Sequence, residues 1–315
     1  MTLSISINQI NYVLALYKTG SFSKAADLCS VTQSTLSTMV RKLENQMDLQ
    51  IFDRKSKPIR LTKEGQLFID QFRIIQHEFD NLKELVQETK QEFHGTLKIG
   101  IIPTLAPFLL PLFLTKMIKK HPGINISIDE LTTKEIVKKI KLRELDIGIL
   151  SLPLDDQQIK QKSLFFEDFL IYDARKNKQS SKKYKIKDID VNRLWLLEES
   201  HCLTGQIEKI CHLRKSRNLN QKLIFNSGSI LSLLEVVKMN DGITLLPRLA
   251  TERKNLIDMK NIHSIESPTP VREIGLITHI NFVKNKFLLM LEKEIGVAVK
   301  PFLKSSKKVH IIKPF

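Results

Sequence analysis

Apolar residues recur at helical spacing through the first part of the chain and divide it into short helices. The first helix contains Ile10 and should end at Gly20, because glycine readily adopts the left-handed conformation that follows many helices. A second helix is expected in 21–29, with Ser23 as its N-cap. A third is predicted over 33–44. Its buried side consists of three aliphatic residues, Leu36, Val40 and Leu43.

The exposed side of the third helix combines short polar side chains with one cation. These residues are Gln33, Ser34, Ser37, Thr38 and Arg41. They suit close approach to base edges and phosphates in a major groove. A short basic hairpin is predicted over 52–62, where Arg54 and Lys57 would contact the flanking backbone. Three helices followed by a basic hairpin indicate a winged helix-turn-helix DNA-binding domain in 1–62. A helical protein-interaction domain is the alternative.

A longer amphipathic helix is predicted from its cap, Thr62, to about Glu92, and we assign 63–94 to a linker. Its apolar residues alternate at steps of four and three: Phe68, Phe72, Ile75, Phe79, Leu82 and Val86. This heptad spacing favours a dimer-forming helix over a helix packed on one domain. A dimer would present two recognition helices to a pseudo-palindromic operator on double-stranded DNA.

Short apolar runs alternate with helical segments after Gly95, which predicts an α/β fold with a parallel sheet in two lobes. The first lobe should contain strands at 97–102, 124–129 and 147–150, and helices at 109–120 and 133–142. The second should contain strands at 194–197, 223–225 and 242–247, and a helix through Leu231 and Val237. The run 274–277 is expected to return to the first lobe. Two such lobes in 95–315 would enclose a hinged cleft, and no pattern is evident in the basic tail from Pro301.

Composition narrows the class of protein. With 315 residues, 42% of them hydrophobic and 27% charged, the chain can form two or three domains with proper cores. Three cysteines argue against a secreted disulfide scaffold, so we expect a protein of the reducing cytosol. No apolar run approaches the roughly 20 residues that span a membrane. The net charge of +16 favours a polyanionic partner, although a general lysine bias accounts for part of it.

Cys202 and Cys211 lie nine positions apart in a segment with helical periodicity. A helix would separate their Cα atoms by about 13 Å, whereas a disulfide requires them within about 7 Å. Joining the two thiols would therefore require local refolding. The third cysteine, Cys29, is interpreted as a small core residue.

The N-terminal motifs resemble those of the LysR-type transcriptional regulators. The matching stretches are 22–26, 32–37, 41–44 and 52–54. This resemblance implies a winged helix-turn-helix, a long linker helix and a two-lobed α/β effector domain of periplasmic-binding-protein type. It also implies that the protein forms a homotetramer of two dimers on promoter DNA and requires no cofactor. RNA polymerase is a possible further partner.

The stretch 197–203, followed by Cys211, resembles the peroxide-sensing regulators of that family. Thr133 and Arg272 match positions where that family has a pocket threonine and a pocket arginine, and 101–104 resembles its first effector strand. The resemblance implies that hydrogen peroxide oxidises Cys202 and that Cys211 captures the product. The hydroxyls of Thr104 and Thr133 could orient the peroxide, Arg272 could stabilise the thiolate or the leaving oxygen, and His201 adjoins the nucleophile. Such a site is expected to lower the pKa of its thiol, since the thiolate is the nucleophile.

The sequence departs from this pattern and leaves alternatives open. Thr204 and Gly205 stand where that family typically has arginine and aspartate, which affects proton delivery to the leaving oxygen. The cysteines could instead be inert core residues, or bind zinc together with His201 and His212. A LysR-type regulator with an organic-acid inducer and a thiol peroxidase are the other readings.

Overall fold

A computed structural model of the chain describes residues 4–88, 95–175, 183–198, 200–212, 227–252, 257–303 and 309–314, without the side chains of 83–88. The chain forms two compact units, one of 1–91 with 142–144 and one of 92–141 with 145–315. None of the helices in the described ranges combines the length and apolar character that a membrane span requires.

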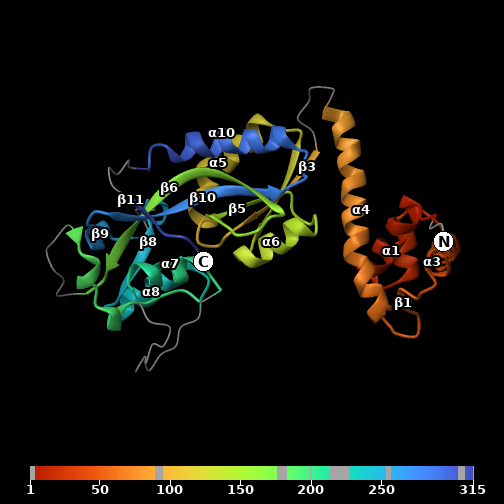
Figure 1. Cartoon of the computed structure of the whole chain (residues 1–315), viewed down its shortest axis with the longest axis horizontal. Helices are drawn as coiled ribbons and strands as arrows, with labels where there is room; N and C mark the ends of the chain where they lie inside the picture. The colour runs from red at the N-terminus through yellow and green to blue at the C-terminus, as the bar shows by residue number, and fades with distance from the viewer. Residues whose placement is uncertain are drawn as a thin grey trace. The chain divides into compact units, whose positions relative to one another are not determined.

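The N-terminal unit contains the predicted helices and hairpin (Figure 1). Its elements are α1 (Ile7–Thr19), α2 (Phe22–Leu28), α3 (Gln33–Met47), β1 (Phe52–Asp53), β2 (Arg60–Leu61) and α4 (Lys63–Glu88). Gly20 follows α1 with a φ of 60°, and β1 pairs antiparallel with β2. The three predicted residues on the inner side of α3 are fully buried, as expected.

The prediction of Ser23 as an N-cap is wrong. The amide of Ala25 donates to the carbonyl of Ser21, so α2 begins at Phe22 and Ser21 is the cap residue. The cap predicted for α4 is confirmed, because Thr62 Oγ1 accepts from the amide of Gly65 at 2.9 Å.

The apolar residues of α4 at heptad spacing, which we call the seam, form a buried part and an exposed part. Phe72 is buried in the core of the N-terminal domain. Ile75, Phe79 and Leu82, by contrast, are 39%, 37% and 57% exposed. The Val86 side chain and the predicted end of this helix near residue 92 lie outside the described residues. These exposed residues are therefore the ones that the predicted dimer would cover.

The second unit has a mixed α/β architecture. Its strands are β3 (Gly95–Ile101), β4 (Ile124–Glu130), β5 (Ile147–Leu152), β6 (Ile159–Asp173), β7 (Lys183–Tyr184), β8 (Ile243–Pro247), β9 (Ile262–Ile265), β10 (Thr269–His279) and β11 (Val309–Ile311). Its α-helices are α5 (Ala106–Lys120), α6 (Thr133–Lys141), α7 (Cys202–Ile210), α8 (Ile230–Met239), α9 (Arg248–Thr251) and α10 (Asn285–Val299).

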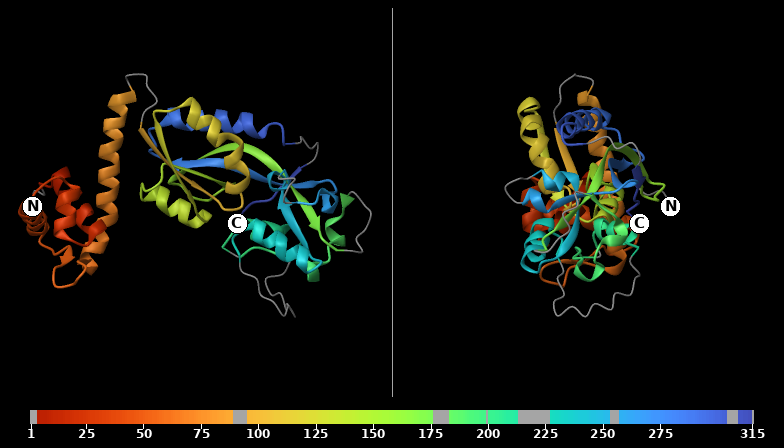
Figure 2. Two further views of the ribbon diagram at one scale, coloured as in Figure 1. Left: turned by 180° about the vertical axis from the view of Figure 1, so that it is seen from behind. Right: turned by 90° about the vertical axis from the view of Figure 1, so that its left-hand side faces the viewer.

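The strand order is β4-β3-β5-β10-β6-β9-β7, with β8 paired to β6 and β11 to β10. Among the strands that the sequence predicted, the parallel arrangement is found for β3, β4 and β5. The strand β10 returns to β5 as expected, but runs antiparallel to it and to β6. The first part of β6 pairs with β10 and its last part with β8 and β9, so this strand connects the two lobes (Figure 2).

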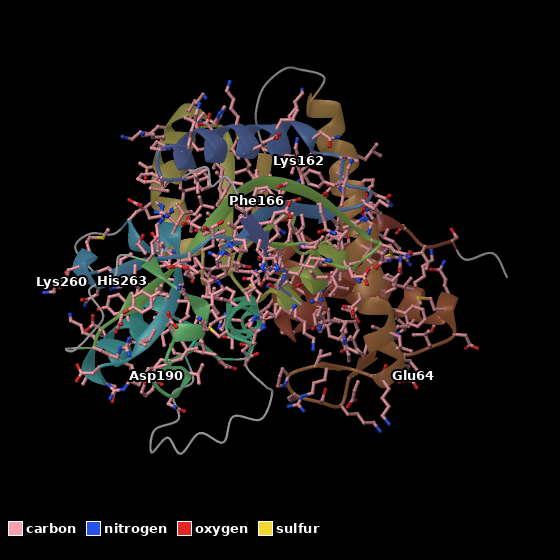
Figure 3. All side chains as sticks on the ribbon, turned by 60° about the vertical axis from the view of Figure 1, so that its left-hand side comes forward. Glu64, Lys162, Phe166, Asp190, Lys260 and His263 are labelled. Atoms are coloured by element: carbon pink, nitrogen blue, oxygen red, sulfur yellow. The ribbon has the colours of Figure 1, made fainter. Side chains whose placement is uncertain are left out.

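The sequence missed the long strand β6 and the helix α10. Lys162, labelled with Phe166 on β6 in Figure 3, donates to a carboxylate oxygen of Glu292 on α10 at 2.6 Å. This contact joins the strand to the helix that covers it.

Two expectations for the second lobe change. The run 194–197 is not a strand, because Leu194 forms only an isolated bridge to Ile243. The Trp195 amide and carbonyl bond to Ile243 and Thr244 of β8, without a continuing ladder. The tail, which shows no pattern in sequence, contains β11. The predicted strand at 223–225 lies outside the described residues, as do 304–308 of the tail.

Candidate functional site

The helix α7 holds the two cysteines at its opposite ends. Cys202 is its first residue, His201 is its N-cap, and Cys211 follows its last residue. The two thiols are not joined by a disulfide. Cys202 is 5% exposed and belongs to the main hydrophobic core, whereas Cys211 is half-buried. The predicted separation of the two thiols by a helix is confirmed.

Burial dominates the chemistry of the Cys202 thiol. Removal from water raises its pKa, because the charged thiolate loses its solvation. The positive charge of Arg272, the hydroxyl of Thr133 and the amides of Leu203 and Cys202 itself act in the opposite direction. They do not outweigh burial, so the expectation of a lowered thiol pKa is wrong. In this conformation the thiol is protonated at neutral pH.

Arg272 lies at the centre of a buried polar network on the crossing strands β6 and β10. Its Nη1 donates to Thr104 Oγ1 at 3.2 Å and its Nη2 to the Thr104 carbonyl at 3.3 Å. Its Nε donates to Glu167 Oε1 at 2.8 Å. The other oxygen of Glu167 accepts from the Leu249 amide at 3.1 Å. Thr104 therefore supports Arg272, and Glu167 is a site residue that sequence reasoning missed.

His201 packs against the loop that precedes α8. A side chain on Gly228 would place its Cβ 2.6 Å from His201 Nε2, so a larger residue at this position would force the imidazole to move. Burial lowers the pKa of His201, although Glu198 raises it, and the imidazole is neutral at pH 7. The hydroxyl of Thr204 donates to the carbonyls of Leu197 and Glu198 at 3.0 and 3.2 Å. Thr204 thereby holds the loop that carries His201.

Two buried oxygens near the thiol have no hydrogen-bond partner of ordinary geometry among the described residues. They are Thr133 Oγ1 and Gln206 Oε1. Gln206 follows Cys202 by one helical turn, which places both on the same face of α7. Its Nε2 donates to Ser151 Oγ at 3.2 Å and to the Ile312 carbonyl at 2.7 Å. Thr133 nevertheless acts on the Cys202 thiol, so Gln206 Oε1 is the buried oxygen left without a partner among the described residues of this site. Sequence reasoning did not assign Gln206.

The described residues contain no group of three or more histidine, cysteine, aspartate or glutamate side chains suited to a metal ion. In particular, α7 places Cys202 and Cys211 at opposite ends of a helix. This arrangement separates the four residues that a zinc site would have to combine.

The predicted DNA-binding residues lie on α3 and in the hairpin of β1 and β2. Gln33, Ser34, Thr38, Arg41, Arg54 and Lys57 are exposed, and Ser37 is half-buried. Arg54 is partly engaged within the domain. Its Nη2 lies 2.7 Å from Glu44 Oε2, and its guanidinium lies 5.4 Å from the centre of the Phe22 ring. Glu44 also accepts from two backbone amides, so Arg54 braces the wing as well as facing solvent.

Comparison with known families accounts for both units. Residues 7–66 match the bacterial regulatory helix-turn-helix protein of the lysR family, and residues 90–281 match the LysR substrate binding domain. The chain belongs to the LysR family. It is a DNA-binding transcriptional regulator and not an enzyme, which removes the thiol peroxidase reading.

Its relatives include regulators with different names. The HTH-type transcriptional regulator EstR of Acinetobacter baylyi is 32% identical over 87% of this chain and 90% of its own. The DNA-binding transcriptional dual regulator OxyR of Escherichia coli is 30% identical over 87% and 89%.

Solved OxyR structures share the fold of this chain. A full-length OxyR variant from Pseudomonas aeruginosa matches with a TM-score of 0.75 and 24% identity, over 93% of this chain and 98% of that one. A hydrogen-peroxide-bound OxyR mutant from Corynebacterium glutamicum matches with a TM-score of 0.54 and 22% identity, over 96% and 99%.

Proposed function

We propose that this chain is a peroxide-responsive transcriptional regulator of the cytoplasm and that Cys202 is the thiol that hydrogen peroxide oxidises. The observation that supports it is the position of Cys202, buried at the start of α7 within reach of the Arg272 charge and of the Thr133 hydroxyl. The likeness to E. coli OxyR and to relatives named hydrogen peroxide-inducible genes activators supports the same assignment.

The first step transfers one oxygen atom to sulfur. The Cys202 thiol loses its proton, and the thiolate attacks one peroxide oxygen while the O–O bond breaks. Hydroxide leaves and takes up the released proton, so the products are a sulfenic acid and water. Arg272 stabilises the negative charge as it moves from sulfur to the leaving oxygen. Gln206 Oε1, and Thr133 Oγ1 once it turns from sulfur to the bound peroxide, would accept from the O–H groups of peroxide.

The second step forms the disulfide. The Cys211 thiolate attacks the sulfenic sulfur of Cys202, and the sulfenic oxygen leaves as water after protonation. Since α7 keeps these residues at its two ends, this step requires the helix to unwind. In a tetramer of two DNA-binding dimers, the refolded segment would change how subunits meet, so that both redox states bind DNA with different geometry.

Footprinting on operator DNA, with and without peroxide, tests the proposal. The wild type should protect different lengths in the two states, while Cys202→Ser should give the reduced footprint in both. Cys29→Ser is the matched control and should respond like the wild type. In Cys211→Ser, a dimedone label should detect the sulfenic acid while no intramolecular disulfide appears by mass spectrometry. A normal peroxide response of Cys202→Ser would refute the assignment.

A second candidate is a regulator that binds an organic-acid inducer. Arg272 is a buried cation that could hold a carboxylate, and EstR is as similar to this chain as OxyR. The guanidinium, however, is already paired with Glu167, with Nη2 2.7 Å from Oε1. A regulatory response retained after both Cys202 and Cys211 are replaced by serine would favour this candidate.

A further inference from the structure

The last described segment of the chain adds a short strand to the sheet beside the candidate site. Val309 and Ile311 pair in parallel with Thr269 and Val271 of β10. The amide of Ile312 then donates to the Val271 carbonyl at 2.8 Å. Val271 directly precedes Arg272, so the segment is attached to the strand that carries the buried cation.

Beyond β11 the segment crosses to α7, where the C-terminal label of Figure 1 stands beside the helix. Gln206 Nε2 donates to the Ile312 carbonyl at 2.7 Å, and Lys209 Nζ donates to the Lys313 carbonyl at 3.3 Å. A Cβ on Gly205 would lie 3.4 Å from the Pro314 carbonyl oxygen. The three α7 residues involved all lie between the two cysteines.

Apolar burial reinforces these polar contacts. Ile312 is 5% exposed and belongs to the same core cluster as Cys202, Leu203 and Ile207. Its neighbour Ile311 points away and is 44% exposed. Gln206 is fully buried, so breaking its bond to Ile312 would leave polar atoms unpaired away from water.

We propose that residues 309–314 form a strap that holds α7 in its helical form, and that joining Cys202 to Cys211 requires the strap to detach. A helix of this length separates its ends by about 13 Å, whereas the disulfide requires about 7 Å or less. Gln206 lies in the middle of the segment that must unwind, and it cannot keep its bond to Ile312 while its backbone is rebuilt. The strap therefore opposes disulfide formation.

The role of the strap in a peroxide response rests on the proposed function, but its effect on the disulfide can be tested without peroxide. Diamide adds to the half-buried Cys211 thiol, and Cys202 then attacks the Cys211 sulfur and releases the hydrazine, so that two electrons and two protons pass from the thiols to diamide. The test uses reduced full-length protein carrying Cys29→Ser, in which the Cys202–Cys211 disulfide is followed by mass spectrometry. Ile312→Ala should form it about tenfold faster or more, since it removes a buried anchor. Ile311→Ala is the matched control and should stay within about twofold of its parent.

Hydrogen exchange gives a second measurement that needs no variant. The amide of Ile312 should be protected in the reduced protein, because it bonds to Val271, and should lose most of that protection in the disulfide form. Equal diamide rates for folded Ile312→Ala and Ile311→Ala, or equal protection of this amide in both redox states, would overturn the strap. If peroxide yields no disulfide while diamide gives the expected difference, the sensor assignment fails and the strap stands.

Discussion

Replacing Glu167 by glutamine tests how the charge of Arg272 is shared within the buried site. One carboxylate oxygen of Glu167 accepts from Arg272 and the other accepts from the Leu249 amide. Both side chains are buried, with relative exposures of 1% for Arg272 and 0% for Glu167. Glutamine keeps the shape and one acceptor oxygen, but it leaves the guanidinium without its counter-charge.

The magnitude follows from this burial. Removing one partner of a buried ion pair typically costs about 3–5 kcal/mol, because the remaining charge is uncompensated. In a domain of about 200 residues, each kcal/mol lowers the melting temperature by about 2–4 °C, so we expect a decrease of roughly 6–20 °C. The same substitution should lower the thiol pKa of Cys202, because Arg272 already lowers it and its charge would no longer be offset.

The assay uses protein in which Cys29 and Cys211 are serine, so that Cys202 is the only thiol. Thiolate absorbance against pH reports the pKa, and circular dichroism against temperature reports stability. Glu273→Gln is the control, because Glu273 is the next residue along β10, half-buried and on the other side of the strand. This control should change stability by less than about 1 kcal/mol and leave the thiol titration unchanged.

An unchanged or higher thiol pKa in folded Glu167→Gln would show that the charge of Arg272 does not reach sulfur. An unchanged melting temperature would show instead that the guanidinium finds another partner. Either result would refute the reasoning that Glu167 limits the effect of Arg272 on Cys202.

Three further predictions concern pH, DNA and assembly. The rate at which peroxide oxidises Cys202 should rise with pH below the raised thiol pKa, because the reactive thiolate fraction grows; a flat profile between about pH 6 and 9 would contradict this. Arg41→Ala and Lys57→Ala should each flatten the salt dependence of DNA binding by about one unit of log–log slope. Arg54→Ala should mainly destabilise the N-terminal unit, by roughly 1–2 kcal/mol, because Glu44 loses its ion-pair partner. If Arg54→Ala changed the salt slope as much as the other two variants, Arg54 would instead contact a DNA phosphate. Leu82→Lys should dissociate a dimer in light scattering, whereas Leu67→Lys, at a position 77% exposed and outside the seam, should not.

The sequence predicted those helices and strands in which the pattern of buried positions stays the same along the whole element. The strand β5 is buried throughout, and α6 buries Thr133, Ile136 and Ile140 at helical steps. The strand β6 was missed because its burial changes along its length. It is mostly exposed near Ile159 and continuously buried toward Asp173, since it leaves one lobe and enters the other. The strand β11 was missed for a different reason: all three of its residues are exposed, so it carries no pattern.

The candidate site was predictable only where a motif carried it. Cys202, Thr133 and Arg272 were identified from a resemblance, and all three meet in the structure. Glu167 could not be found in this way, because it faces Arg272 only through the register of β6 on β10. The raised pKa of the Cys202 thiol could not be predicted from the sequence either, since it depends on how completely the surrounding core covers the sulfur atom.

A protonated, buried thiol suits a sensor that must ignore most other reactants. The covering that raises the pKa of Cys202 also excludes large oxidants, whereas hydrogen peroxide is hardly larger than water. In the proposed mechanism, oxidation adds a hydroxyl to sulfur inside this buried site. A buried polar group without a partner costs about 1–3 kcal/mol, so the new hydroxyl would draw the side-chain amide of Gln206, one turn away, toward sulfur. Because Gln206 also holds Ile312, the chemical step itself would weaken the contact that keeps α7 helical.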